Sequence, residues 1–136
     1  MVKNLIQAVA RALVNVFGDG YEIYVGTVEQ GMCPPCFRIS HQKTERTPLL
    51  GRRYLEKNTL LVEYFPGNKQ VSDLCQVGAD IVDGLEFITG QNGDVFHGTD
   101  RSWTVLENNL CATVRYSTVL IRTVDTFPME EMTIHL

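Results

Sequence analysis

The stretch that decides the fold is residues 54–65, YLEKNTLLVEYF. Its second half carries apolar residues on both faces of an extended chain, Leu60, Val62 and Tyr64 on one face and Leu61 and Phe65 on the other. Apolar residues on both faces are typical of a strand inside a sheet that is covered on both sides. We therefore predict a long strand, Tyr54–Phe65, whose second half is central and covered on both sides.

The residues before this strand predict one helix and two shorter strands. Residues 2–17 place apolar side chains at helical spacing and polar ones opposite, and Gly18–Gly20 ends the helix. Tyr21–Val25 is rich in aromatic and β-branched residues, and Cys36–Ser40 alternates apolar and polar residues, and each pattern favours a strand. The chain therefore starts with an amphipathic helix followed by strands.

Residues 41–53 form a polar stretch that we expect to be a loop. Its basic residues outnumber its one acid, Glu45, and they are Lys43, Arg46, Arg52 and Arg53. No other stretch of this acidic protein is markedly basic. These four cations are the candidate interface residues, because complementary charges give an interface its register and specificity. A solvated loop is the alternative interpretation for each of them.

The residues after the long strand predict a second helix and three more strands. Pro66–Asn68 stops the strand, and Val71–Ile88 has helical periodicity despite Gly78 and Gly84, which we interpret as marks of close packing. The later strands are expected at 94–98, 103–106 and 110–124, with a turn at Gly98–Ser102 between the first two.

The order helix, three strands, helix, three strands predicts an α+β fold. Its simplest form is one antiparallel or mixed sheet with two helices packed on it. We expect residues 1–124 to form a single domain and residues 125–136 to be a mobile or partner-docked tail.

Composition excludes several classes of protein. The 136 residues carry a net charge of −4, which argues against general nucleic-acid binding. The N-terminal segment lacks the apolar core and cleavage site of a secretory signal, and no run of 18 apolar residues is present. The four cysteines are therefore expected to be reduced thiols made in a cytosol.

The Cys33-Pro34-Pro35-Cys36 segment is the most conspicuous candidate site. A redox pair needs a helix after its first cysteine, but a strand pattern follows here. A zinc site would need two further ligands, and Cys75 and Cys111 stand singly in a predicted helix and strand. Turn chemistry is the favoured interpretation, and a four-cysteine zinc site made of Cys33, Cys36, Cys75 and Cys111 is the alternative.

No other residues form a convincing catalytic or cofactor site. The histidines are scattered, and they are His41, His97 and His135. The paired carboxylates lie in the tail or on a polar helix face, and they are Glu130, Glu131, Asp80 and Asp83. Gly18–Gly20 follows a helix, whereas a phosphate-binding loop opens one. We therefore expect no catalytic residue and no cofactor, and the chain is not expected to be an enzyme.

Two segments carry a family resemblance. Residues 30–39, QGMCPPCFRI, resemble a Q-G-x-x-x-P-C-F-x-I segment. Residues 51–54, GRRY, followed by 62–66, VEYFP, are similar to a G-x-R-Y … Y-F-P block. Both occur in this order in small phage and prophage proteins of the tail terminator family, and the resemblance spans essentially the whole chain.

The resemblance implies a structural protein of the virion tail, made in the host bacterial cytoplasm. Such a protein forms a homo-oligomeric ring, typically a hexamer, that caps the tail tube, stops its polymerisation and docks the head-side connector. DNA would pass through the ring without sequence-specific binding, and no membrane is involved. Another head–tail connector or head-completion protein is an alternative, and a zinc-binding interaction module is an alternative from a different class.

Overall fold

The computed structural model describes residues 2–26, 31–67 and 74–121. The elements in chain order are α1 (Val2–Phe17), β1 (Glu22–Val25), β2 (Cys36–Pro48), β3 (Arg53–Phe65), α2 (Leu74–Gly84), β4 (Phe87–Thr89), β5 (Val95–Val105) and β6 (Leu110–Ile121). The six strands form one sheet in the order β1-β2-β3-β6-β5-β4, in which β1 is parallel to β2 and the other neighbours are antiparallel. The fold is therefore α+β with a mixed sheet and two helices, which confirms the predicted class and element order.

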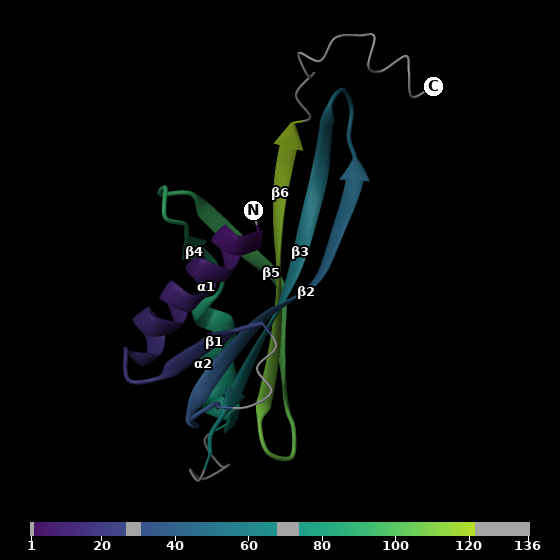
Figure 1. The fold of residues 1–136 in the computed structure, drawn as a ribbon. Helices are drawn as coiled ribbons and strands as arrows, with labels where there is room; N and C mark the ends of the chain where they lie inside the picture. The colour runs from purple at the N-terminus through teal and green to yellow at the C-terminus, as the bar shows by residue number, and fades with distance from the viewer. Residues whose placement is uncertain (1, 27–30, 68–73, 122–136) are drawn as a thin grey trace.

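Strand β3 lies inside the sheet, as the sequence predicts, with β2 on one side and β6 on the other over its whole length. Leu60, Val62 and Tyr64 point into the hydrophobic core. The prediction that both faces are covered is wrong for the described residues, because α1 and α2 lie on the same face (Figure 1). On the opposite face Leu61 and Phe65 are only half-buried.

The core joins the two helices to the centre of the sheet. Helix α1 contributes Leu5, Val9 and Leu13, and α2 contributes Leu74 and Ile81. Helix α2 packs closely against its neighbours at two glycines. A Cβ added at Gly78 would lie 2.5 Å from Cδ2 of Trp103 in β5, and one at Gly84 would lie 2.5 Å from Cγ2 of Val16 in α1. This confirms that these glycines serve close packing.

Residues 41–53 are the largest departure from the predicted elements. They are not a loop: β2 continues to Pro48, a short turn follows, and β3 begins at Arg53, so the segment is a β-hairpin. The prediction failed because the hairpin has no apolar face to give a strand pattern. Its cross-strand pairs are polar instead, for example Thr44 with Asn58 and Arg46 with Glu56.

Two further boundaries differ from the prediction. Helix α2 ends at Gly84, and Phe87–Thr89 is a strand that pairs with β5, so the helix does not reach Ile88. Strand β5 is continuous from Val95 to Val105, with a register shift between Thr99 and Ser102 in place of the expected turn. Tertiary pairing therefore overrides the local signals at both places.

Candidate interaction surface

One end of the sheet projects beyond the helices and forms what we call the arm. It comprises residues 43–48 of β2, the turn 49–52, residues 53–59 of β3 and residues 117–121 of β6. Strand β1 pairs with β2 only as far as Ile39, and β5 pairs with β6 only as far as Tyr116. The arm is therefore a three-stranded sheet, and it extends away from both helices (Figure 1).

A chain of polar contacts replaces an apolar core in the arm. The Thr44 hydroxyl donates to Asn58 Oδ1 at 2.6 Å, so the His41 Nε2 that lies 2.6 Å from the same hydroxyl acts as an N–H donor. Asn58 Nδ2 donates to Glu56 Oε1 at 3.1 Å, and Arg46 Nε donates to Glu56 Oε2 at 2.8 Å. Asn58 is fully buried and Glu56 is 2% exposed, so these bonds satisfy groups that water does not reach.

The environment of Glu56 favours its charged form. The hydrogen bond from Asn58 lowers the pKa of this carboxyl below its usual value, and Arg46 lowers it further, whereas burial acts in the opposite direction. The net shift is downward. A buried carboxylate with two donors is therefore a stable part of the arm and not a group poised to take up a proton near neutral pH.

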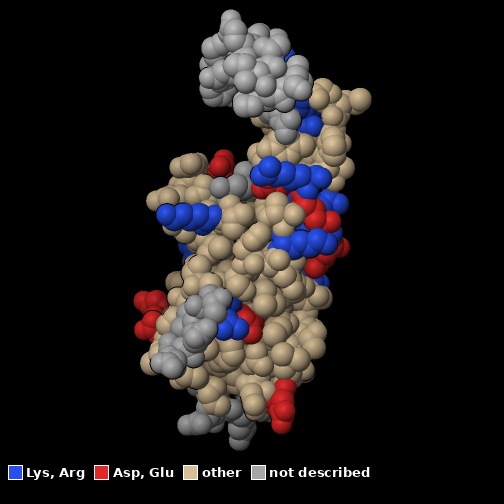
Figure 2. Space-filling model, turned by 45° about the vertical axis from the view of Figure 1, so that its right-hand side comes forward, with Lys and Arg blue, Asp and Glu red and all other residues tan. Residues whose placement is uncertain are grey.

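The face of the sheet away from the helices carries ion pairs that cross several strands. Arg38 Nε donates to Glu63 at 2.8 Å, and Arg115 reaches Asp100 at 2.9 Å and Glu45 at 3.8 Å. Lys43 lies 3.6 Å from Glu45 on this face. Figure 2 shows how charged side chains gather over the upper part of the molecule, where Figure 1 places the arm.

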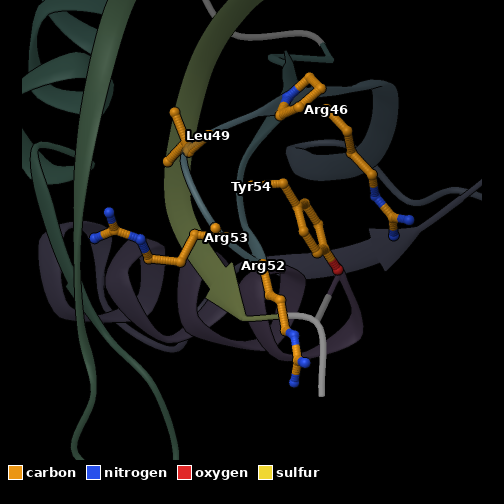
Figure 3. A pocket seen from close by; sticks show the side chains of 7 residues that line it. Arg46, Leu49, Arg52, Arg53 and Tyr54 are labelled. Atoms are coloured by element: carbon orange, nitrogen blue, oxygen red, sulfur yellow. The ribbon is translucent and has the colours of Figure 1, made fainter. Parts of the chain in front are cut away.

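The tip of the arm contains a hollow with basic and aromatic walls. Its volume is about 390 Å³, and its lining residues are Arg46, Pro48, Leu49, Gly51, Arg52, Arg53 and Tyr54. The side chains of Arg46, Arg52 and Tyr54 point to one side of the strands, and Arg53 points to the other (Figure 3). The Arg46 guanidinium carbon lies 5.3 Å from the centre of the Tyr54 ring, which is within cation–π range.

The four candidate cations differ in whether an acidic side chain of the same protein already pairs with them. Lys43 pairs with Glu45, and Arg46 pairs with Glu56. Among the described residues, Arg53 donates only to the backbone oxygen of Leu50, at 3.4 Å, and Arg52 makes no hydrogen bond or ion pair. The structure thus brings Arg46, Arg52 and Arg53 to one hollow and leaves Lys43 outside its lining.

Sequence reasoning missed two features of the tip. Tyr54 was assigned to a strand and to the G-x-R-Y block but not to the candidate interface residues, yet its ring forms a wall of the hollow. Leu50 is 85% exposed at the turn, and the run Leu49-Leu50-Gly51-Arg52-Arg53 combines apolar and basic residues. The two leucines directly before two arginines were the signal available in the sequence, because arginine is enriched in the core of protein–protein interfaces.

The structure does not bring the four cysteines of the alternative zinc site together into one metal-binding group. Cys36 is buried at the start of β2 and Cys111 is half-buried in β6, whereas Cys33 and Cys75 are exposed. No group of three or more histidine, cysteine or acidic residues that could hold a metal occurs among the described residues. Burial raises the pKa of the Cys36 and Cys111 thiols, which is the opposite of what a metal ligand or a redox nucleophile needs.

The remaining candidate groups have structural surroundings. His97 stacks on Phe87 with ring centroids 4.7 Å apart, and Asp80 accepts a hydrogen bond from Gln76 at 2.9 Å. His135, Glu130 and Glu131 lie outside the described residues, as does the whole predicted tail 125–136. Within the described part of the chain, neither helix has the length and apolar character that crossing a membrane requires.

Comparison with known proteins gives one informative match. A family model described as phage tail terminator protein matches residues 4–128. No curated protein matches the chain. Solved structures include 23 chains that match, and one of them is 13% identical, with an alignment that covers 92% of this chain and 99% of that chain and a TM-score of 0.40.

Proposed function

The chain belongs to the phage tail terminator family, and from this premise we propose that it forms a ring that caps the tail tube, stops its polymerisation and docks the head-side connector. The family match makes the chain a structural protein of the virion tail. We propose that the ring is a hexamer, as is typical in this family, that the protein is made in the host cytoplasm, and that DNA passes through the ring. This role requires interfaces and no catalysis.

The observation that carries the proposal is the projecting arm with its uncompensated cations. A ring of identical subunits needs contacts between unlike surfaces that close on themselves. The arm reaches beyond the helix-covered part of the sheet and presents Arg52, Arg53 and the exposed Leu50 at its tip. A neighbouring subunit or the tube, with complementary acidic groups, would fit such a tip.

Deletion of the gene from the parent phage, followed by electron microscopy of the tails, tests the terminator role. Loss of a terminator gives tails of uncontrolled length that are not joined to heads. Tails of normal length that lack heads would instead identify a connector or head-completion protein. Normal tails with heads attached would overturn both functions.

A charge-reversal variant tests the role of the tip. Arg52→Glu/Arg53→Glu should reduce phage yield at least about tenfold while the purified protein keeps its thermal stability, because both side chains contact no acidic group among the described residues. Arg11→Glu is the matched control, since Arg11 is exposed on α1 away from the arm. Equal phage yields from the two variants would show that the tip of the arm is not part of the interface.

A further inference from the structure

A second hollow, which we call the notch, lies where β5 separates from β6. Strand β5 pairs with β6 only as far as Gly98 and Tyr116, and its first residues, 95–97, pair with β4 instead. The notch has a volume of about 580 Å³, and it is lined by residues 90–92, 94–96 and 117–119 together with Asn4. Within the described part of the chain, the edge of β6 at residues 117–121 therefore has no second neighbouring strand beside it.

The notch presents groups that have no partner in the described chain. Thr118 lines it, and the buried Oγ1 of this residue makes no hydrogen bond with a described residue. A buried hydroxyl without a partner is unfavourable, and a bound segment that supplies one removes this cost. Asp94 also lines the notch without pairing with a described basic side chain, and Val95 next to it is 66% exposed. A segment with a cation, an apolar side chain and hydrogen-bonding groups would fit there.

The tip of the arm carries the groups that complement the notch. Among the described residues Arg52 has no acidic partner, and Arg53 donates only to a backbone oxygen. Leu50, in the same turn, is 85% exposed. The tip therefore offers two cations and an apolar side chain, whereas the notch offers a carboxylate and an apolar side chain. Such opposite charges give a contact its register and its choice of partner.

The tip and the notch have no residue in common. A contact between the tip of one copy and the notch of another is therefore heterologous, because it joins two different surfaces. Repeated from copy to copy, a heterologous contact forms a ring when its rotation closes.

We propose that the tip of the arm docks in the notch of a second copy of this chain. Arg52 and Arg53 face Asp94 of that copy, and Leu50 packs against its Val95. The turn also supplies the hydrogen-bond partner that the Thr118 hydroxyl lacks. This inference rests on the proposed function and deepens it, because it names the surface that receives the tip and selects the neighbouring subunit over the tube.

Chemical cross-linking tests the contact in the purified full-length protein and in assembled tails. The exposed native cysteines are first removed by Cys33→Ser/Cys75→Ser. Leu50→Cys protein mixed with Val95→Cys protein should then form covalent dimers with a short bismaleimide, whereas neither protein should do so alone. A chain with both changes should give a ladder of products that ends at the size of the ring. Glu107→Cys, in place of Val95→Cys, is the exposed control that should not cross-link.

A charge swap tests the same contact without cysteines. Arg52→Glu/Arg53→Glu and Asp94→Arg should each reduce phage yield at least about tenfold, because each places like charges opposite each other. Combining the three changes restores opposite charges and should recover most of the yield. Glu107→Arg is the control for Asp94→Arg, because Glu107 is exposed and lies outside the notch.

Three results would overturn the docking. They are no cross-linked product in either the purified protein or the tails, cross-linking of Leu50→Cys protein with itself, and a charge swap that recovers no yield. The last result would mean that the tip binds the tube or another partner. Tail length in the deletion phage is measured separately. Long tails without cross-links would reject only the docking, and cross-links with tails of normal length would reject only the terminator role.

Discussion

Strand β3 runs through two regions that are stabilised in different ways. Leu60 and Glu56 lie on the same face of this strand, and both are almost fully buried. Leu60 belongs to the body, by which we mean the two helices and the part of the sheet that they cover, and it packs in the hydrophobic core. Glu56 belongs to the arm, where Arg46 and Asn58 hold it by hydrogen bonds.

The difference shows what each region can do. Apolar burial is non-directional and large, so the body can supply most of the free energy of folding. Hydrogen bonds contribute less net stability but require a particular geometry, so the polar chain in the arm fixes the register of the hairpin.

Truncating matched leucines in the two regions should give the largest contrast. Leu60→Ala should lower the free energy of unfolding by about 2–5 kcal/mol, because it leaves a cavity in the core. Leu55→Ala, on the same strand within the arm, should cost about 1 kcal/mol or less, because Leu55 is only half-buried. Denaturant unfolding measures both values, and equal losses would contradict the division between body and arm.

Adding one methyl group to α2 should disturb the body by a smaller amount. Gly78→Ala should cost about 1–3 kcal/mol, because the new Cβ meets the Trp103 ring, even though alanine favours the helix by about 1 kcal/mol. In a Trp103→Ala background the substitution should become neutral or stabilising. Gly20→Ala is the control, since a Cβ there meets no atom within 4 Å. A Gly78→Ala protein as stable as the wild type would show that the ring moves at little cost.

The stability of the arm should depend on pH through Glu56. Glu56→Gln should cost about 0.5–1.5 kcal/mol at pH 7, seen mainly as faster hydrogen exchange in the β2–β3 hairpin. Because the folded protein lowers the pKa of Glu56, the advantage of the wild type is present above the usual glutamate pKa of about 4.3. This extra stability of the wild type should disappear as the pH falls through the lowered pKa that Glu56 has in the folded protein.

Hydrogen exchange between pH 7 and pH 3 checks this linkage. Each exchange rate must first be corrected for its intrinsic dependence on pH. Glu107→Gln, at an exposed position between β5 and β6, is the matched control and should leave the hairpin unchanged at every pH. A wild-type advantage that stays constant down to pH 3 would mean that Glu56 is not the group responsible.

Local patterns predicted the body better than the arm. Helix α1 has the predicted bounds, because an amphipathic face of 16 residues gives a strong periodic signal. The hairpin 41–53 had no such signal, since its inward residues are polar and their partners, such as Asn58 for Thr44, come from another strand. The basic residues of the candidate surface were found from composition alone, but their grouping with Tyr54 required the hairpin to form.

The sequence by itself determined the α+β class, the order of elements and the family, because periodicity and short motifs are properties of neighbouring residues. Only the tertiary structure decided that both helices cover one face of the sheet, and that a polar stretch becomes a projecting arm. It also decided which cations are compensated, since Arg46 meets Glu56 across the hairpin while Arg52 and Arg53 remain at the tip. These features depend on pairing between strands that are distant in the sequence. Residues that come into contact only after such pairing cannot be recognised from the local sequence pattern.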